Sequence, residues 1–181
     1  MRVFGIDPGS NRTGYGCIDS DGRRLRLVVC GAIRAGADAS FPDKLAAIHR
    51  ALSEVLVECR PQCVAIENLF HATNVRSALK LGHARGVAML AAVEAGLEIV
   101  EYTPAEIKRA VVGYGRAEKG QVGQMVKLLL RLDAVPAPDD AADALAVAIC
   151  HVHSGFGPLA GPKLQVPSHK PTSWRSYRPR A

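Results

Sequence analysis

The segment V-F-G-I-D-P-G-S-N-R-T-G-Y-G-C-I, residues 3–18, contains two short apolar runs joined by a turn. The first run ends at Asp7, where Pro8 and Gly9 interrupt it, and the second run begins at Thr13. A turn signal at residues 19–22 and a run rich in Val and Leu at residues 25–33 follow. This pattern predicts a meander of three strands at the start of a sheet.

Helical and strand-like segments alternate after the meander. Apolar residues recur at helical spacing over 41–59, with Ser40 as a cap, and a short strand at 63–66 ends at Glu67. We expect a helix over 74–95 closed by Gly96, a strand at 97–100, and helices over 104–111, 122–132 and 140–153. The order predicts an α/β fold with a mixed five-stranded sheet and helices on both faces.

Length and charge indicate one folded domain followed by a basic tail. The chain has 181 residues, 48% of them hydrophobic, and a formal net charge of +6. Residues 155–181 contain five basic residues, five prolines and no acid, so we expect a domain over 1–154 and a disordered extension over 155–181. The apolar runs are too short to cross a bilayer, which favours a cytoplasmic protein with no membrane contact. The five scattered cysteines form no CxxC pair and are interpreted as free thiols.

Four acidic residues stand at positions where they could meet. Asp7 and Glu67 each end a predicted strand, and side chains at the ends of neighbouring parallel strands emerge about 5 Å apart. Asp140 and Asp143 share one face of an alanine-rich helix that can approach another element closely. The alternative is that these acids lie in the first helical turn only because negative charge there interacts favourably with the helix dipole. Asp139 fits this alternative as the N-cap.

A cluster of four carboxylates needs a positive partner. Their mutual repulsion in a partly buried site amounts to several kcal/mol, on the order of Coulomb energies at intermediate dielectric. Oxygen ligands without Cys select a hard cation, Mg²⁺ or Mn²⁺, and two such ions about 4 Å apart form the arrangement that cleaves phosphodiesters. The pattern therefore predicts metal-dependent phosphodiester hydrolysis.

Six segments, in unbroken order, closely resemble motifs of the RuvC family of crossover junction endodeoxyribonucleases. They are G-I-D-P-G (5–9), T-G-Y-G (13–16), I-E-N-L-F (66–70), S-A-L-K-L-G-H-A-R-G (77–86), A-E-K (117–119) and D-A-A-D-A-L-A (140–146). The resemblance covers residues 1–154. It implies a ribonuclease-H-like fold and a homodimer that resolves Holliday junctions in recombination and repair.

The resemblance also implies the details of the reaction. Two Mg²⁺ ions per subunit, replaceable by Mn²⁺, would support symmetric nicks that leave 5′-phosphate and 3′-hydroxyl ends. The metal-binding catalytic acids would be Asp7, Glu67, Asp140 and Asp143, with Lys119 as a further catalytic residue. The expected partners are four-way junction DNA and the RuvA and RuvB branch-migration proteins.

Several other residues are candidates for DNA contact. Phe70 follows the strand that ends at Glu67, where it is either a buried hinge residue or, as the resemblance favours, a ring that wedges between bases. The basic candidates either form a solvated face or neutralise phosphates around the acidic site. They are Arg76, Lys80, Arg85, Lys108, Arg116 and Lys119. Small residues at 78, 82 and 86 either pack inside the domain or, as the resemblance implies, help to form the dimer.

Two alternative functions belong to other classes, and a third is a related nuclease. A Gly-Ile-Asp-Pro-Gly loop followed by Thr-Gly is also typical of actin-like and sugar-kinase-like ATP-binding proteins, but those proteins need a second domain that this length does not provide. A noncatalytic junction-binding module would not need four acids. A related ribonuclease-H-like nuclease acting on another branched or RNA substrate is the alternative that the sequence leaves open.

Overall fold

The computed structural model describes residues 1–36, 38–68 and 74–155. Its centre is one five-stranded sheet with the order β3-β2-β1-β4-β5. The strands β1 (Arg2–Asp7), β2 (Arg12–Ser20) and β3 (Leu25–Arg34) form an antiparallel meander, while β4 (Cys63–Glu67) and β5 (Glu98–Tyr102) continue the sheet parallel to β1. The mixed sheet and its meander confirm the prediction, and the edge of the sheet where β1, β4 and β5 end collects their final residues.

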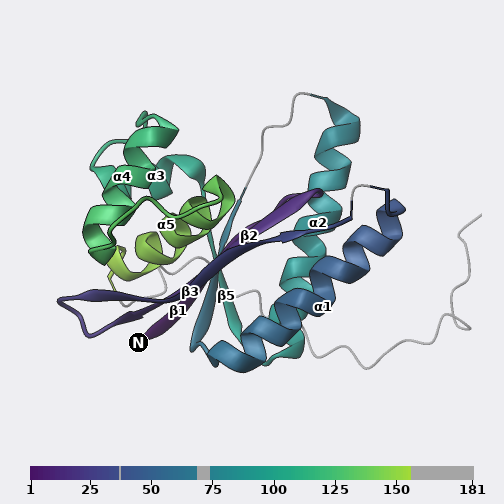
Figure 1. Ribbon diagram of the computed structural model, residues 1–181, viewed down its shortest axis with the longest axis horizontal. Helices are drawn as coiled ribbons and strands as arrows, with labels where there is room; N and C mark the ends of the chain where they lie inside the picture. Colours follow the sequence, from purple (N-terminus) through teal and green to yellow (C-terminus); the bar gives the residue numbers. More distant parts are fainter. Residues whose placement is uncertain (37, 69–73, 156–181) are drawn as a thin grey trace, which may run out of the picture.

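Helices cover both faces of this sheet (Figure 1). On one side, α1 (Phe41–Cys59) and α2 (Val75–Glu94) pack on Phe4 and Ile6 of β1. On the other side, α3 (Pro104–Val112), α4 (Lys119–Leu130) and α5 (Asp139–His153) pack on Val3 and its neighbours. Successive residues of β1 therefore point to opposite cores, as strand geometry requires.

The helix α5 lies against β1 and β2 at positions occupied by glycine. A Cβ atom on Gly14 would be 1.9 Å from the carbonyl oxygen of Asp140, and one on Gly5 would be 2.1 Å from that of Ala144. Five of the nine buried residues of α5 are alanines, and Ala144 and Ala148 lie directly over Gly5, so little side-chain bulk separates the two backbones at that point. This close approach brings the first turn of α5 to the edge where β1 ends.

The N-terminal ends of α5 and α4 differ from the predictions. Asp139 does not cap α5: the helix begins at this residue, its N-cap is Pro138, and no side chain caps the end. The N-cap interpretation was therefore wrong, because the last residue with extended backbone is Pro138 and Asp139 is already the first residue of the helix. Helix α4 begins at Lys119, earlier than predicted, since Glu118 and Gln121 form a capping box there.

The cysteine and membrane predictions can also be compared with the structure. All five cysteines are free, and four of them are buried while Cys30 is partly buried. In the described ranges, no helix has an apolar stretch sufficient to cross a lipid bilayer. The predicted tail lies outside the described residues apart from Gly155.

Candidate active site

Asp7 and Glu67 stand side by side at one edge of the sheet. Ile6 of β1 pairs with Ile66 of β4 in a parallel register, so the next residue of each strand emerges at the same level. Neighbouring strands lie about 5 Å apart, so the two carboxyl groups are close enough for Glu67 to raise the pKa of Asp7 through its charge and a hydrogen bond. The parallel pairing predicted from the sequence is present, and it creates one half of the site.

The first turn of α5 supplies the other half. Asp140 and Asp143 are close enough to act electrostatically on Asp7, and Asp143 lies with Glu67 in the wall of a pocket of about 270 Å³. Asp139 lies at the rim: its side chain is 80% exposed against 25% for Asp143, and its carboxylate is 3.9 Å from the Lys119 amine. The structure thus brings together the four acids that the sequence singled out and leaves the fifth exposed at the rim.

Two basic side chains contact this acidic cluster. The Lys119 amine, at the start of α4, lies 2.7 Å from a carboxylate oxygen of Asp143. The Arg12 guanidinium, at the start of β2, lies 3.6 Å from a carboxylate oxygen of Asp140. Sequence reasoning missed Arg12, although its position five residues after Asp7, on the far side of a tight turn, is a signal that it returns to the same edge.

Burial and mutual repulsion dominate the electrostatics. Burial raises the pKa of Asp7 well above its ordinary range, and the charges of Glu67, Asp143 and Asp140 add to the effect. Burial also raises the pKa of Glu67 and of Asp143, although Lys119 partly offsets the change at Asp143. The hydrogen bond to Asp143 in turn raises the pKa of Lys119. Burial and mutual repulsion therefore favour the protonated form of Asp7 when no cation is bound.

We expect metal-free protein to lose stability as pH rises because of Asp7. The pKa of an Asp in the unfolded chain is 3.8, whereas burial raises the pKa of folded Asp7 to about 8. Between these values the folded state binds more protons than the unfolded state, so rising pH favours unfolding. Melting temperatures in chelator should therefore fall more steeply from about pH 5 to about pH 8 for wild type than for Asp7→Asn. Parallel curves for the two proteins would contradict this prediction.

The donor set suits hard divalent cations. The four acids offer only oxygen ligands. Burial raises the pKa of Asp7, Glu67 and Asp143, and neighbouring carboxylates raise it further, so a bound cation would favour the charged form of these three groups. Among the described residues, no three His, Cys, Asp or Glu side chains are already arranged as a preformed metal site. The hydrogen bond between Asp7 and Glu67 and the contact of Lys119 with Asp143 hold these carboxylates in other interactions. Cations would have to replace those interactions.

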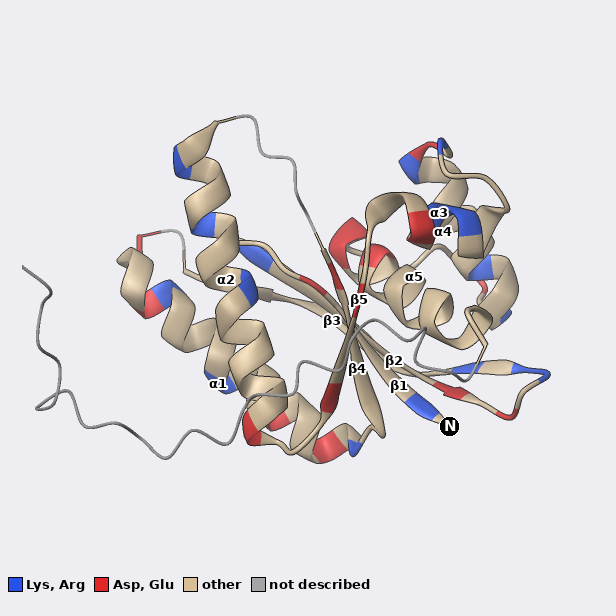
Figure 2. Cartoon of the chain, turned by 180° about the vertical axis from the view of Figure 1, so that it is seen from behind, with Lys and Arg blue, Asp and Glu red and all other residues tan. Residues whose placement is uncertain are grey.

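The candidate DNA-binding residues fall into three groups. Lys108 and Lys119 line the acidic pocket, and Arg116 is exposed in the segment between α3 and α4. Arg76 and Lys80 are exposed on α2, on the other side of the sheet. Figure 2 shows the basic residues along α2 in blue, separated from the acidic residues, in red, where β4 ends and α5 begins.

The two remaining candidates are Arg85, which is paired with an acid, and Phe70. The Arg85 guanidinium lies 2.6 Å from a carboxylate oxygen of Glu101, so its charge is already paired within the protein. That carboxylate also accepts a hydrogen bond from the Asn68 side chain. Phe70 lies outside the described residues.

Comparison with known proteins gives a consistent family match. The family model described as crossover junction endodeoxyribonuclease RuvC matches residues 3–151, a range that includes all four acids. RuvC of Alkaliphilus oremlandii is 53% identical over 155 residues, covering 86% of this chain and 94% of that protein. RuvC of Trichlorobacter lovleyi is 51% identical over 180 residues, covering 99% of this chain and 100% of that protein. The structure of Thermus thermophilus RuvC in complex with a Holliday junction substrate matches with a TM-score of 0.81 at 35% identity, covering 85% of this chain and 94% of that chain.

Proposed function

The chain belongs to the RuvC family of crossover junction endodeoxyribonucleases, and on that premise we propose that it resolves four-way DNA junctions by nicking two strands symmetrically. The single observation that carries the proposal is the convergence of Asp7, Glu67, Asp140 and Asp143 at one edge of the sheet. Four buried or half-buried acids held by three different elements are costly to the fold unless a bound cation compensates them. This cost supports a catalytic use of the cluster.

Asp7, Glu67, Asp140 and Asp143 would hold two Mg²⁺ ions, for which Mn²⁺ can substitute. When bound, the ions supply Lewis-acid chemistry that activates a water molecule and stabilises the departing 3′ oxygen. Carboxylates must be deprotonated to act as ligands, so metal binding and release of the Asp7 proton are coupled. Lys119 would then leave Asp143 and hold a phosphate oxygen through the same amine.

The basic residues would position the DNA backbone around this site. Lys108 and Lys119 line the acidic pocket and are suited to the phosphates on either side of the cleaved bond. Arg116 would contact the backbone beyond them, and Arg76 and Lys80 would contact a strand over α2.

Arg85 would have to exchange Glu101 for a phosphate, or else order α2 through that ion pair. Phe70 is proposed to wedge between bases.

We propose that the exposed apolar face of α2 pairs with a second copy of the chain. Val75 is 77% exposed and Leu79 59% exposed, and Leu90 further along the same helix is half exposed. A groove of about 510 Å³ runs over Gly82 and Gly86, where an added Cβ would meet nothing within 4 Å. A two-fold dimer through this face would bury the apolar residues and present two equivalent active sites to the junction.

Leu79→Glu is expected to weaken this dimer by about 100-fold, because it would place an unpaired carboxylate in an apolar interface. Sedimentation equilibrium of the full chain measures the monomer–dimer constant. Leu128→Glu is the matched control, since Leu128 is 65% exposed on α4, on the opposite face of the sheet. A wild-type chain that stays monomeric at micromolar concentration would contradict the dimer itself.

The function is tested by comparing a synthetic four-way junction with a linear duplex of the same sequence. We expect paired symmetric nicks on the junction with Mg²⁺ or Mn²⁺, ends that carry 5′-phosphate and 3′-hydroxyl groups, and no cleavage in chelator. Equal cleavage of both DNAs would refute junction selectivity. Preferential cleavage of an RNA or another branched substrate would favour the related nuclease that the sequence left open.

The remaining proposals concern the cellular setting. We propose that the enzyme acts in the cytoplasm on junctions that RuvA and RuvB move. We also propose that residues 1–154 form the nuclease domain and that the basic tail over 155–181 adds nonspecific DNA affinity.

A further inference from the structure

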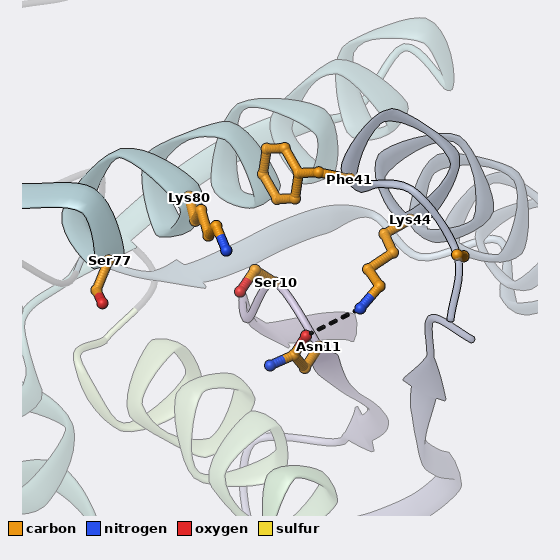
Figure 3. A pocket seen from close by; sticks show the side chains of 7 residues that line it. Ser10, Asn11, Phe41, Lys44, Ser77 and Lys80 are labelled. Carbon is orange, nitrogen blue, oxygen red and sulfur yellow. Dashed lines mark hydrogen bonds between the residues drawn. The ribbon is translucent and has the colours of Figure 1, made fainter. Parts of the chain in front are cut away.

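A second pocket opens between the loop that joins β1 to β2 and the N-terminal ends of α1 and α2 (Figure 3). Its volume of about 340 Å³ is in the range of small-ligand sites. Two of the residues that line it are lysines and none is acidic, in contrast to the neighbouring active site. The lining residues are Ser10, Asn11, Ala39, Phe41, Lys44, Ser77 and Lys80.

The two lysines point into this pocket from different helices. The Lys44 amine, from α1, donates a long hydrogen bond of 3.5 Å to the side-chain oxygen of Asn11. The Lys80 amine, from α2, lies 5.8 Å from the centre of the Phe41 ring. Figure 3 shows both amines turned toward Ser10 and Asn11, so two positive charges converge on one polar turn.

Backbone dipoles add to this positive potential. Phe41 is the first residue of α1, and Ser77 lies in the first turn of α2, so the positive ends of two helices face the pocket. Hydroxyl groups of Ser10 and Ser77 and the side-chain amide of Asn11 add hydrogen-bond donors. Lysines, helix N-termini and neutral donors together are the chemistry that recognises a phosphate group.

The distance to the active site limits which phosphate can reach the pocket. Ser10 follows Asp7 by three residues, so their Cα atoms are at most about 11 Å apart even in a fully extended chain. A DNA strand advances about 3.4 Å along the helix axis per nucleotide. A strand cut beside Asp7 would therefore place a phosphate at Ser10 within about three nucleotides of the cleaved bond.

We propose that this pocket binds one backbone phosphate of the strand being cut, within about three nucleotides of the scissile bond. The inference rests on the proposed function and deepens it, because it assigns a position in the substrate to Ser10, Asn11 and Lys44 and gives Lys80 a defined ligand. The pocket would fix the register of the strand, while the acids Asp7 and Asp140 act on the bond itself.

The test combines a double variant with neutral phosphates in the DNA. Lys44→Gln/Lys80→Gln is made in the Asp7→Asn background, in chelator so that the DNA stays uncut, and binding to a four-way junction is measured by fluorescence anisotropy. Single methylphosphonates are placed at each of the first four linkages from the cut site. We expect one linkage at which the neutral group weakens DNA binding by the parent about tenfold or more and does not change binding by the double variant.

Salt dependence gives a second, independent readout. Loss of one phosphate contact should reduce the slope of log binding constant against log salt by about 0.9. Arg23→Gln removes one charge at the exposed tip between β2 and β3, at the opposite edge of the sheet, and should leave the slope and the methylphosphonate scan unchanged. If the double variant melts at a lower temperature than its parent, the single variant Lys80→Gln replaces it in both measurements, because Lys80 is exposed.

The outcomes separate this proposal from the proposed function. If the wild-type chain cuts junctions, but a methylphosphonate at every tested linkage weakens DNA binding equally in the parent and in the double variant, the pocket assignment alone would be overturned. A chain that shows the expected linkage but does not cut junctions would overturn the proposed function alone. Tight binding of inorganic phosphate or thymidine monophosphate that the double variant loses would assign the pocket to a free phosphate compound and overturn the DNA assignment.

Discussion

Asp7→Asn is expected to lower metal-dependent junction cleavage by about 10³-fold or more while junction binding persists. Asp7 lies at the centre of the acidic site, where Glu67, Asp140 and Asp143 all act on it. An amide cannot supply the negative charge that a divalent cation requires, and metal ions contribute several kcal/mol to such transition states. At about 1.4 kcal/mol per tenfold, a loss of about 4 kcal/mol gives this factor. Single-turnover cleavage with Mg²⁺ is the measurement.

The neighbouring acid on α5 supplies the matched control. Asp139→Asn makes the same chemical change at a residue whose side chain is 80% exposed, and cleavage should stay within about twofold of wild type. Asp7→Asn should also melt no earlier than wild type in chelator, because it removes a carboxylate that burial and repulsion disfavour. Inactivity without loss of stability would separate catalysis from folding, and an active Asp7→Asn protein would refute the assigned role.

Gly14→Ala is expected to destabilise the protein by about 3 kcal/mol and to lower cleavage by about 10²-fold. The added methyl carbon would lie 1.9 Å from the carbonyl oxygen of Asp140. That oxygen belongs to backbone, so no rotation of a side chain can relieve the contact, and the first turn of α5 must move. Asp140 and Asp143 would move with it, away from Asp7. Chemical denaturation and Mg²⁺-dependent cleavage measure the two effects.

Gly120→Ala is the control for the glycine substitution. Gly120 lies in α4, where an added Cβ would meet nothing within 4 Å. Alanine favours a helix over glycine by up to about 1 kcal/mol, so this variant should be as stable as wild type or more stable. If both variants had the same stability as wild type, the close packing of α5 would not be what holds the acids in place.

The sequence was most informative where local signals were strong. The apolar runs, the turn at Pro8 and Gly9, and the Ser40 cap predicted the strands and α1 with boundaries near those observed. Asp7 and Glu67 could be paired because residues that end parallel strands meet at one edge. The same reasoning failed at Asp139, where a good capping residue begins the helix instead. Local propensity could not show that the preceding chain enters α5 already extended.

Residue identity and spacing alone determined the strand order of the meander, the four acids and the cation chemistry that they favour, because these follow from local periodicity and from the charges of the side chains. Only the tertiary structure decided how close α5 comes to β1 and β2, that Lys119 contacts Asp143, that Arg85 is paired with Glu101, and that Lys44 and Lys80 share a pocket. Each of these joins residues distant in sequence. Such distances depend on how whole elements pack, and packing is settled by contacts across the fold that no local segment encodes.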